Sequence, residues 1–143
     1  MCIRDREYSD RSLTEKALDR IRKSKPDFVF LYMVETDEKG GHDNGWMSDE
    51  YLKRISLAID NVRRVIEECS EEYTIIVTAD HGGHERFHGS DIDEDTLIPN
   101  FYIGKDFEKG KQFNGGSILD IAPTIAKIMG VDTALEWEGT PII

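Results

Sequence analysis

Two short apolar runs, each followed by a polar loop that contains glycines, constrain most strongly what this chain can fold into. They are residues 27–34 (DFVFLYMV) and residues 73–78 (YTIIVT), and both are rich in aromatic and β-branched side chains. Continuous apolar runs of this length are typical of strands buried on both faces, as in a parallel sheet. The two runs therefore predict a sheet whose faces are both covered by other elements.

Helical patterns alternate with these strands along the chain. An apolar repeat at helical spacing precedes Pro26, and a long helix is expected after Ser48, whose hydroxyl suits an N-cap. Residues 97–104 (LIPNFYIG) predict a third strand, and a last helix is expected between Asp120 as its N-cap and Gly130 as its stop. This alternation predicts an α/β fold with a mostly parallel sheet and helices on both faces.

Length and charge bound the organisation and the partners. We expect residues 1–11, which are charged and patternless, to be a loose N-terminal tail that need not be native, and we assign residues 12–143 to one domain. The net charge of -11 argues against a nucleic-acid patch or binding to an anionic membrane. No apolar run is long enough for a membrane segment and no signal peptide is visible, which slightly favours the cytoplasm. Cys69 falls on an apolar helix face, where a buried free thiol is expected.

Five candidate metal ligands lie in the two loops that follow the apolar runs. They are Asp37, His42, Asp80, His81 and His88. In α/β proteins with a parallel sheet, bound molecules and ions sit beyond the carboxyl ends of the strands, so we expect the two loops to meet there. Imidazole and carboxylate are zinc ligands, and five donors exceed one tetrahedral ion and suit a two-metal site. A single loop histidine is more often simply solvated; the cluster as a whole favours metal binding.

A second pattern overlaps the same loop. Residues 84–88 (HERFH) match the H-E-x-x-H pattern of zinc metalloproteases, in which His84 and His88 would be ligands. That pattern works only on a helix, and Gly82, Gly83 and Gly89 surround it here. We therefore keep a metalloprotease as a minor alternative, beside a metal-binding module without catalytic activity.

The polar loops and the last helix resemble the alkaline phosphatase superfamily, in particular its type I phosphodiesterase and nucleotide pyrophosphatase relatives. The resemblance rests on residues 36–46 (TDEKGGHDNGW), 77–89 (VTADHGGHERFHG), 117–131 (SILDIAPTIAKIMGV) and 137–142 (WEGTPI). It implies an alkaline-phosphatase-like three-layer sandwich with a mostly parallel sheet. Because the family's domain is at least about twice this length, the chain is expected to be the incomplete, C-terminal part of that domain.

The resemblance also implies roles for the candidate ligands. Asp37, His42 and His88 would hold one divalent metal ion, and Asp80 and His81 would hold a second, with zinc as the first choice and manganese as the alternative. The spacing from Asp37 to His42 is five residues, whereas four is usual in the family. The glycines before His42 can absorb the extra residue, and Glu38, at the usual spacing, is a reserve ligand.

The function implied by the resemblance is metal-dependent hydrolysis of phosphate esters, whether diesters, pyrophosphates or monoesters. In the family a serine or threonine nucleophile comes from an earlier strand, which has no counterpart here, so the chain alone is expected to be inactive. The expected partners are a small phosphorylated substrate and the N-terminal half of the same domain. Arg86 is a candidate for contact with a substrate phosphate, although a loop arginine is more often simply solvated. Trp46 is a candidate wall of the pocket, with ordinary packing as an equal alternative. A phosphate mutase or a sulfatase of the same superfamily is the alternative.

Overall fold

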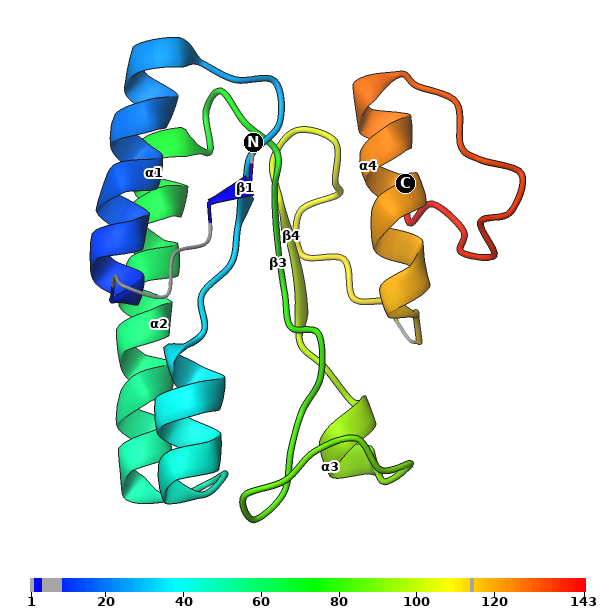
Figure 1. The fold of residues 1–143 in the computed structure, drawn as a ribbon. Coiled ribbons are helices and arrows are strands. Elements are labelled where there is room, and N and C mark those ends of the chain that lie inside the picture. The colour runs from blue at the N-terminus through cyan, green and yellow to red at the C-terminus, as the bar shows by residue number, and fades with distance from the viewer. Residues whose placement is uncertain (1, 4–8, 114) are drawn as a thin grey trace.

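The computed structural model describes residues 2–3, 9–113 and 115–143 of the chain. Its elements mix helices and short strands, so the α/β class expected from the sequence is confirmed. Figure 1 shows helices α1 (Asp10–Ser24) and α2 (Asp49–Cys69) on one side of the strands and α4 (Ile121–Met129) on the other. The strands therefore run between two helical layers, as a partial alkaline-phosphatase-like fold requires.

The two long helices on one side begin at serine caps and pack against each other. The Ser48 hydroxyl accepts the Tyr51 N–H at 3.2 Å and starts α2, as the sequence predicts. Helix α1 buries an apolar face that includes Leu18, with no exposed surface, and an Arg22–Glu68 ion pair joins it to α2. Near the end of α2, Cys69 is a buried free thiol, as expected.

The strands differ from the parallel sheet that the apolar runs predict. Strands β1 (Cys2–Ile3) and β2 (Phe30–Leu31) pair in parallel, but β3 (Ile75–Thr78) and β4 (Asn100–Ile103) pair antiparallel, so the prediction of a mostly parallel sheet is wrong for the third strand. A parallel connection needs a crossover, usually a full helix, and the segment between β3 and β4 holds only the four-residue helix α3 (Asp93–Thr96).

The first apolar run is also less buried than expected. Only two of its residues form β2, and Phe30 is 50 % exposed. Parts of the apolar face of α2 are also exposed. A strand is buried on both faces only where elements of the same chain cover both faces, and among the described residues that cover is partial here.

The two ends of the chain differ in how well the sequence predicts them. Within the expected tail, Cys2 and Ile3 lie in β1 and α1 already begins at Asp10, while residues 1 and 4–8 lie outside the described part. The last helix matches the prediction: a 3-10 turn, η2 (Ile118–Asp120), leads into α4, Asp120 is its N-cap, and Gly130 closes it at φ 66°. Among the described helices, none combines the length and the apolar run needed to cross a membrane.

Asp10 connects α1 to the chain that leads into the first polar loop. Its carboxylate is buried, with 4 % of the residue exposed, and accepts the backbone N–H groups of Val34 and Glu35 at 3.0 Å each. Burial raises the pKa of this carboxyl, and the two N–H donors oppose that shift. The hydrogen bonds therefore fix the position at which the loop begins.

We expect Asp10→Ala to lower the free energy of unfolding by about 1–3 kcal/mol, because two backbone N–H groups lose their acceptor. Chemical denaturation followed by circular dichroism measures the change. Asp19→Ala is the matched control, because Asp19 lies on the exposed side of the same helix and pairs with Lys23 in solvent. Equal stability of the two variants would contradict the role given to Asp10.

Candidate metal centre

The first two candidate ligands lie on a π-helix, η1 (Thr36–His42), which is the next element of the chain after β2. In a π-helix the hydrogen bonds join residues five apart, and the Asp43 N–H accordingly donates to the Glu38 carbonyl. Residues at this spacing lie close to one turn apart, so Asp37 and His42 face the same way and His42 Nε2 lies 3.6 Å from Asp37 Oδ1. The wide turn thus accommodates the extra residue between these two positions.

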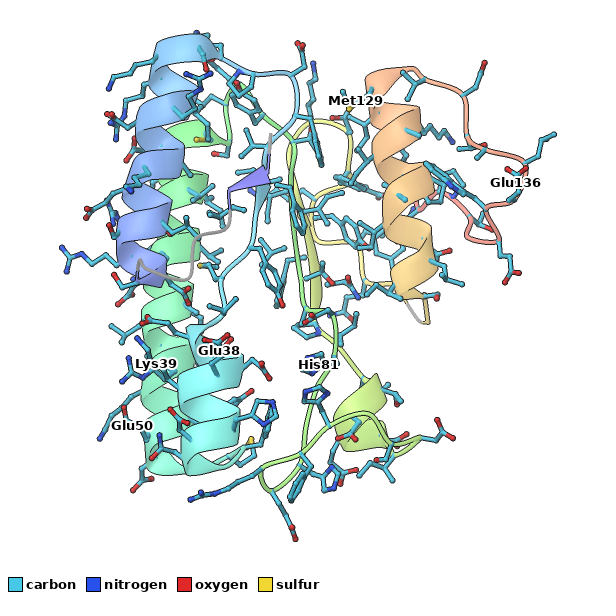
Figure 2. All side chains as sticks on the ribbon, viewed as in Figure 1. Glu38, Lys39, Glu50, His81, Met129 and Glu136 are labelled. Atoms are coloured by element: carbon cyan, nitrogen blue, oxygen red, sulfur yellow. The ribbon has the colours of Figure 1, made fainter. Side chains whose placement is uncertain are left out.

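The remaining candidate ligands lie in the loop that leaves β3. Two hydrogen bonds join this loop to the first: His42 Nδ1 donates to the Arg86 carbonyl at 3.0 Å, and the Trp46 N–H donates to the Glu85 carbonyl at 2.7 Å. Figure 2 shows His81 between η1 and α3, on the side where the two loops meet. The loops that follow two different strands therefore approach each other, as their position in the sequence suggests.

The structure brings all five candidates into one neighbourhood. Donor atoms of Asp37, His42 and His88 lie within 4.8 Å of one another. The His81 ring stacks on His88 with 3.8 Å between centroids, and His81 Nε2 lies 4.0 Å from Asp37 Oδ1 and 3.8 Å from Asp80 Oδ1. Two donors bound to one zinc ion at about 2 Å each lie up to about 4 Å apart, so these separations suit shared ions.

The chemistry of this cluster fits a divalent cation. Asp37 Oδ1 is buried and has no hydrogen-bond partner among the described residues, and a buried carboxylate oxygen without a partner is costly. His42 and His81 each donate Nδ1–H to a backbone carbonyl, the second to Gly82 at 2.7 Å. In a neutral ring this leaves the Nε2 lone pair available, which is the arrangement seen at metal-bound histidines.

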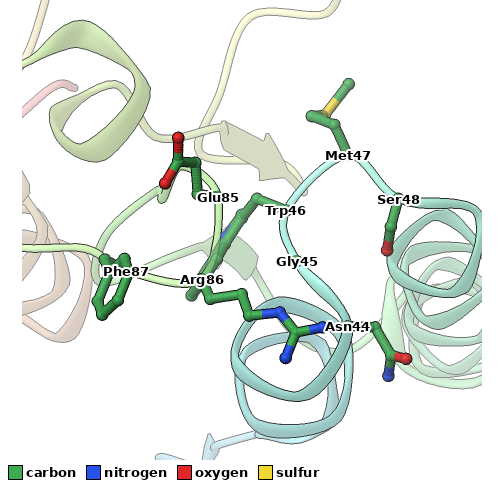
Figure 3. Close-up of a pocket in the computed structure, with 8 residues that line it drawn as sticks. All are labelled: Asn44, Gly45, Trp46, Met47, Ser48, Glu85, Arg86 and Phe87. Atoms are coloured by element: carbon green, nitrogen blue, oxygen red, sulfur yellow. The ribbon is translucent and has the colours of Figure 1, made fainter.

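The reserve ligand Glu38 and the candidate substrate-binding residue Arg86 lie outside the cluster of donors. Glu38, the reserve ligand, is exposed and does not belong to the three-residue group. Arg86 is exposed and extends along a shallow surface hollow, which Figure 3 shows. The hollow is lined by Asn44, Gly45, Trp46, Met47, Ser48, Glu85, Arg86 and Phe87. No contact of the Arg86 guanidinium with a candidate ligand is recorded among the described residues, so its role stays a prediction.

Trp46 packs between the two loops. A Cβ added at Gly41 would lie 2.5 Å from the indole, and one added at Gly83 would lie 2.2 Å from it, so the ring fills the space that side chains at both positions would need. The same ring meets His42 nearly at right angles, with 5.2 Å between centroids and 84° between the ring planes. The indole therefore acts as a spacer between the loops, and its role as a wall of the pocket stays a prediction.

The H-E-x-x-H segment does not form the helix that a metalloprotease requires. His84 and Phe87 instead exchange backbone hydrogen bonds across a tight turn, in which Glu85 adopts a left-handed conformation at φ 46°. His84 Nδ1 donates to the buried Asp95 carboxylate at 2.8 Å, away from the donor group that includes His88. The minor protease alternative is therefore wrong, because its two histidines do not share a helical face.

Asp95 and Asp10 are the residues that sequence reasoning missed. Asp95 lies in an acidic run that resembles a solvated surface, and Asp10 lies in a segment without apolar periodicity. Both are buried and hold backbone N–H groups near the two ligand loops. For Asp10, the one available sequence signal was its place directly after Ser9, which suits a helix N-cap with an acid in the first turn.

We expect Gly83→Ala to displace the Trp46 indole and to destabilise the fold by about 1–3 kcal/mol, as overpacking does. Tryptophan fluorescence in a Trp137→Phe background, together with thermal unfolding, measures both effects. Gly110→Ala is the control: nothing lies within 4 Å of a Cβ there, although φ is +78°, so it reports backbone strain alone. An emission spectrum that Gly83→Ala leaves unchanged would rule out the contact.

The His84–Asp95 pair is expected to stabilise the fold in a limited pH window. The hydrogen bond from His84 lowers the pKa of Asp95, helped by Ser90, and the same bond raises the pKa of His84. Stability from His84 is complete below the unfolded histidine pKa of about 6.5 and is lost as pH rises through the higher folded value. Stability from Asp95 is complete above the unfolded aspartate pKa of about 3.9 and is lost as pH falls.

The melting-temperature difference between the parent chain and His84→Gln should therefore be larger at about pH 5.5 than at about pH 9. Thermal unfolding at the two pH values measures it. Arg63→Gln serves as the control, because it breaks an exposed surface ion pair with Asp60 in which no histidine takes part. A difference for His84→Gln that does not change with pH would count against a charged pair.

Comparisons with known proteins point to a family of metalloenzymes. The model of a family described as the metalloenzyme superfamily matches residues 3–133. The 2,3-bisphosphoglycerate-independent phosphoglycerate mutase of Clostridioides difficile is 30% identical over 144 residues, which cover 96% of this chain and 28% of the relative. The enzymes of the same name from Shewanella pealeana and Bacteroides thetaiotaomicron are 30% and 29% identical over similar stretches.

These comparisons confirm the superfamily and correct the emphasis within it. The relatives are named as mutases, which matches the phosphate-mutase alternative and gives no support to the phosphodiesterase and hydrolase interpretation. The chain spans 27–28% of the length of these relatives. Because the family model matches residues 3–133, the chain belongs to the metalloenzyme superfamily, whose members resemble alkaline phosphatase.

Proposed function

We propose that this chain supplies the metal-holding part of a phosphoryl-transfer enzyme of the phosphoglycerate mutase kind. The relatives with this name cover almost the whole chain, and the superfamily implies divalent metal ions. The observation that carries the proposal is the close group of donor atoms from Asp37, His42 and His88. Because the chain spans 28% of the relative's length, the activity and substrate of the whole relative remain part of the proposal.

The chain's own residues would perform the holding and the orientation. Asp37, His42 and His88 would bind one ion, and Asp80 and His81, whose donor atoms lie 3.8 Å apart, would bind a second. The Tyr32 hydroxyl donates to Asp80 Oδ2 at 3.2 Å and would hold that carboxylate in place. Zinc and manganese are the proposed ions; when bound, they would neutralise phosphate charge and polarise the reacting oxygens.

Charge explains why the metal matters for this substrate class. With a net charge of -11, the chain repels a phosphorylated acid unless bound cations reverse the local field. Arg86 is the cationic side chain of the hollow beside the cluster, and we propose that it contacts a phosphate or carboxylate group of the substrate. The substrate proposed from the relatives is a phosphoglycerate.

We expect Asp37→Ala, His42→Ala and His88→Ala each to weaken Zn²⁺ and Mn²⁺ binding by more than about tenfold, because each removes a ligand rather than an outer partner. Isothermal titration calorimetry on the 143-residue chain measures the affinities. Glu38→Ala is the matched control, since Glu38 is an exposed acid on the same π-helix and lies outside the group. Equal affinities for the ligand variants and the control would reject the metal centre.

Activity distinguishes the mutase from the hydrolase. Interconversion of phosphoglycerate isomers without release of inorganic phosphate would support the mutase, whereas release from p-nitrophenyl phosphate would support hydrolysis. Because the chain alone is expected to be inactive, both assays belong with a protein in which it is joined to the N-terminal part of the domain, loaded with Mn²⁺ and with Zn²⁺ in parallel, and with Asp37→Ala as the negative control. Turnover that Asp37→Ala leaves intact would separate the reaction from this cluster.

A further inference from the structure

We infer that His84 and Asp95 form a clamp that positions the metal ligands His81 and His88; this inference rests on the metal centre proposed above. His84 is the histidine that the metal cluster does not use, and its ring is instead bound to a carboxylate whose side chain is only 1 % exposed. A buried carboxylate needs several donors to stay charged. The groups that donate hydrogen bonds to Asp95 show which parts of the loop this carboxylate holds in place.

Asp95 binds the ligand loop on both sides of His88. One carboxylate oxygen accepts from His84 at 2.8 Å. The other accepts from the Ser90 N–H at 2.8 Å and from the Ser90 hydroxyl at 2.7 Å. His88 lies between the two attached residues, so its backbone is restrained from both ends.

The backbone of α3 binds the loop next to His81. The Gly82 N–H donates to the Asp95 carbonyl at 2.8 Å, and the Gly83 N–H donates to the Glu94 carbonyl at 2.7 Å. Carbonyls at the end of a helix lack partners within the helix, and here the loop supplies them. A Cβ added at Gly82 would lie 2.0 Å from the Glu94 carbonyl oxygen, so only glycine allows this approach. The backbone directly after His81 is therefore held in place by α3.

The short helix α3 thus carries no ligand and yet contacts the loop at Gly82, Gly83, His84 and Ser90. Partners outside the ligand set that orient ligands typically contribute 10- to 100-fold in metal affinity. His84 and Asp95 are positioning residues in this sense, and we expect their loss to weaken metal binding while the ligand set stays the same.

The test compares His84→Ala with His84→Asn, because the asparagine amide can donate from near the position of Nδ1. Zn²⁺ affinity is measured by competition with a chromophoric chelator, and Co²⁺ absorption at saturation reports the set of donors. His84→Ala should weaken Zn²⁺ binding by about tenfold, and His84→Asn should restore most of the affinity. The saturated Co²⁺ spectrum should be the same in the parent chain and in both variants.

Two further variants keep the test decisive if His84→Ala fails to fold. Ser90→Ala removes one donor to Asp95 and should weaken Zn²⁺ binding in the same direction, while Arg63→Ala, which breaks a surface ion pair on α2, should leave it unchanged. Circular dichroism confirms folding of each variant before titration.

Each contrary result has a distinct meaning. Unchanged affinity in His84→Ala, or no recovery in His84→Asn, would overturn the clamp. A changed Co²⁺ spectrum at saturation would overturn it too, by making His84 a ligand. If Asp37→Ala binds Zn²⁺ as well as the parent chain, the metal centre itself is wrong; if it loses binding while His84→Ala does not, only the clamp is wrong.

Discussion

Hydrogen bonds to two consecutive carbonyl oxygens, those of Glu85 and Arg86, hold the two polar loops together. The donors are the Trp46 N–H and His42 Nδ1, and both belong to the loop after β2. This pairing joins loops whose strands, β2 and β3, share no hydrogen bonds with each other among the described residues. The bond from His42 has a second effect, because it fixes which ring nitrogen keeps its lone pair. The hydrogen bond from His42 therefore both joins the two loops and leaves Nε2 as the ring nitrogen with a lone pair.

The π-helix η1 shows how local backbone geometry compensates for a change in sequence spacing. An α-helical turn would separate two ligands five residues apart by well over one turn, whereas the wider turn returns His42 to the face of Asp37. Gly40 and Gly41 make room for Tyr51 and Trp46 at the point where the turn widens. The same geometry explains why Glu38, which has the usual spacing on paper, lies outside the donor group and in solvent.

Sequence reasoning succeeded where a physical rule acts over a few residues. The cap at Ser48, the stop at Gly130 and the convergence of the polar loops follow from local hydrogen bonding and from strand direction. It failed where partners come from afar. The antiparallel pairing of β4 depends on how the intervening segment is used, and the burial of Asp10 and Asp95 depends on N–H groups that only the folded chain presents. No periodicity or motif marks such acids.

The Trp46 indole occupies the volume that a side chain at Gly41 or Gly83 would require, and those glycines belong to different loops. We therefore expect the three positions to be coupled: a larger residue at either glycine needs a smaller residue in place of the indole. A smaller residue at position 46, in turn, opens a gap between the loops. Variation at these sites should consequently arise as correlated changes, and a substitution acceptable in one relative would be harmful when transplanted alone into this chain.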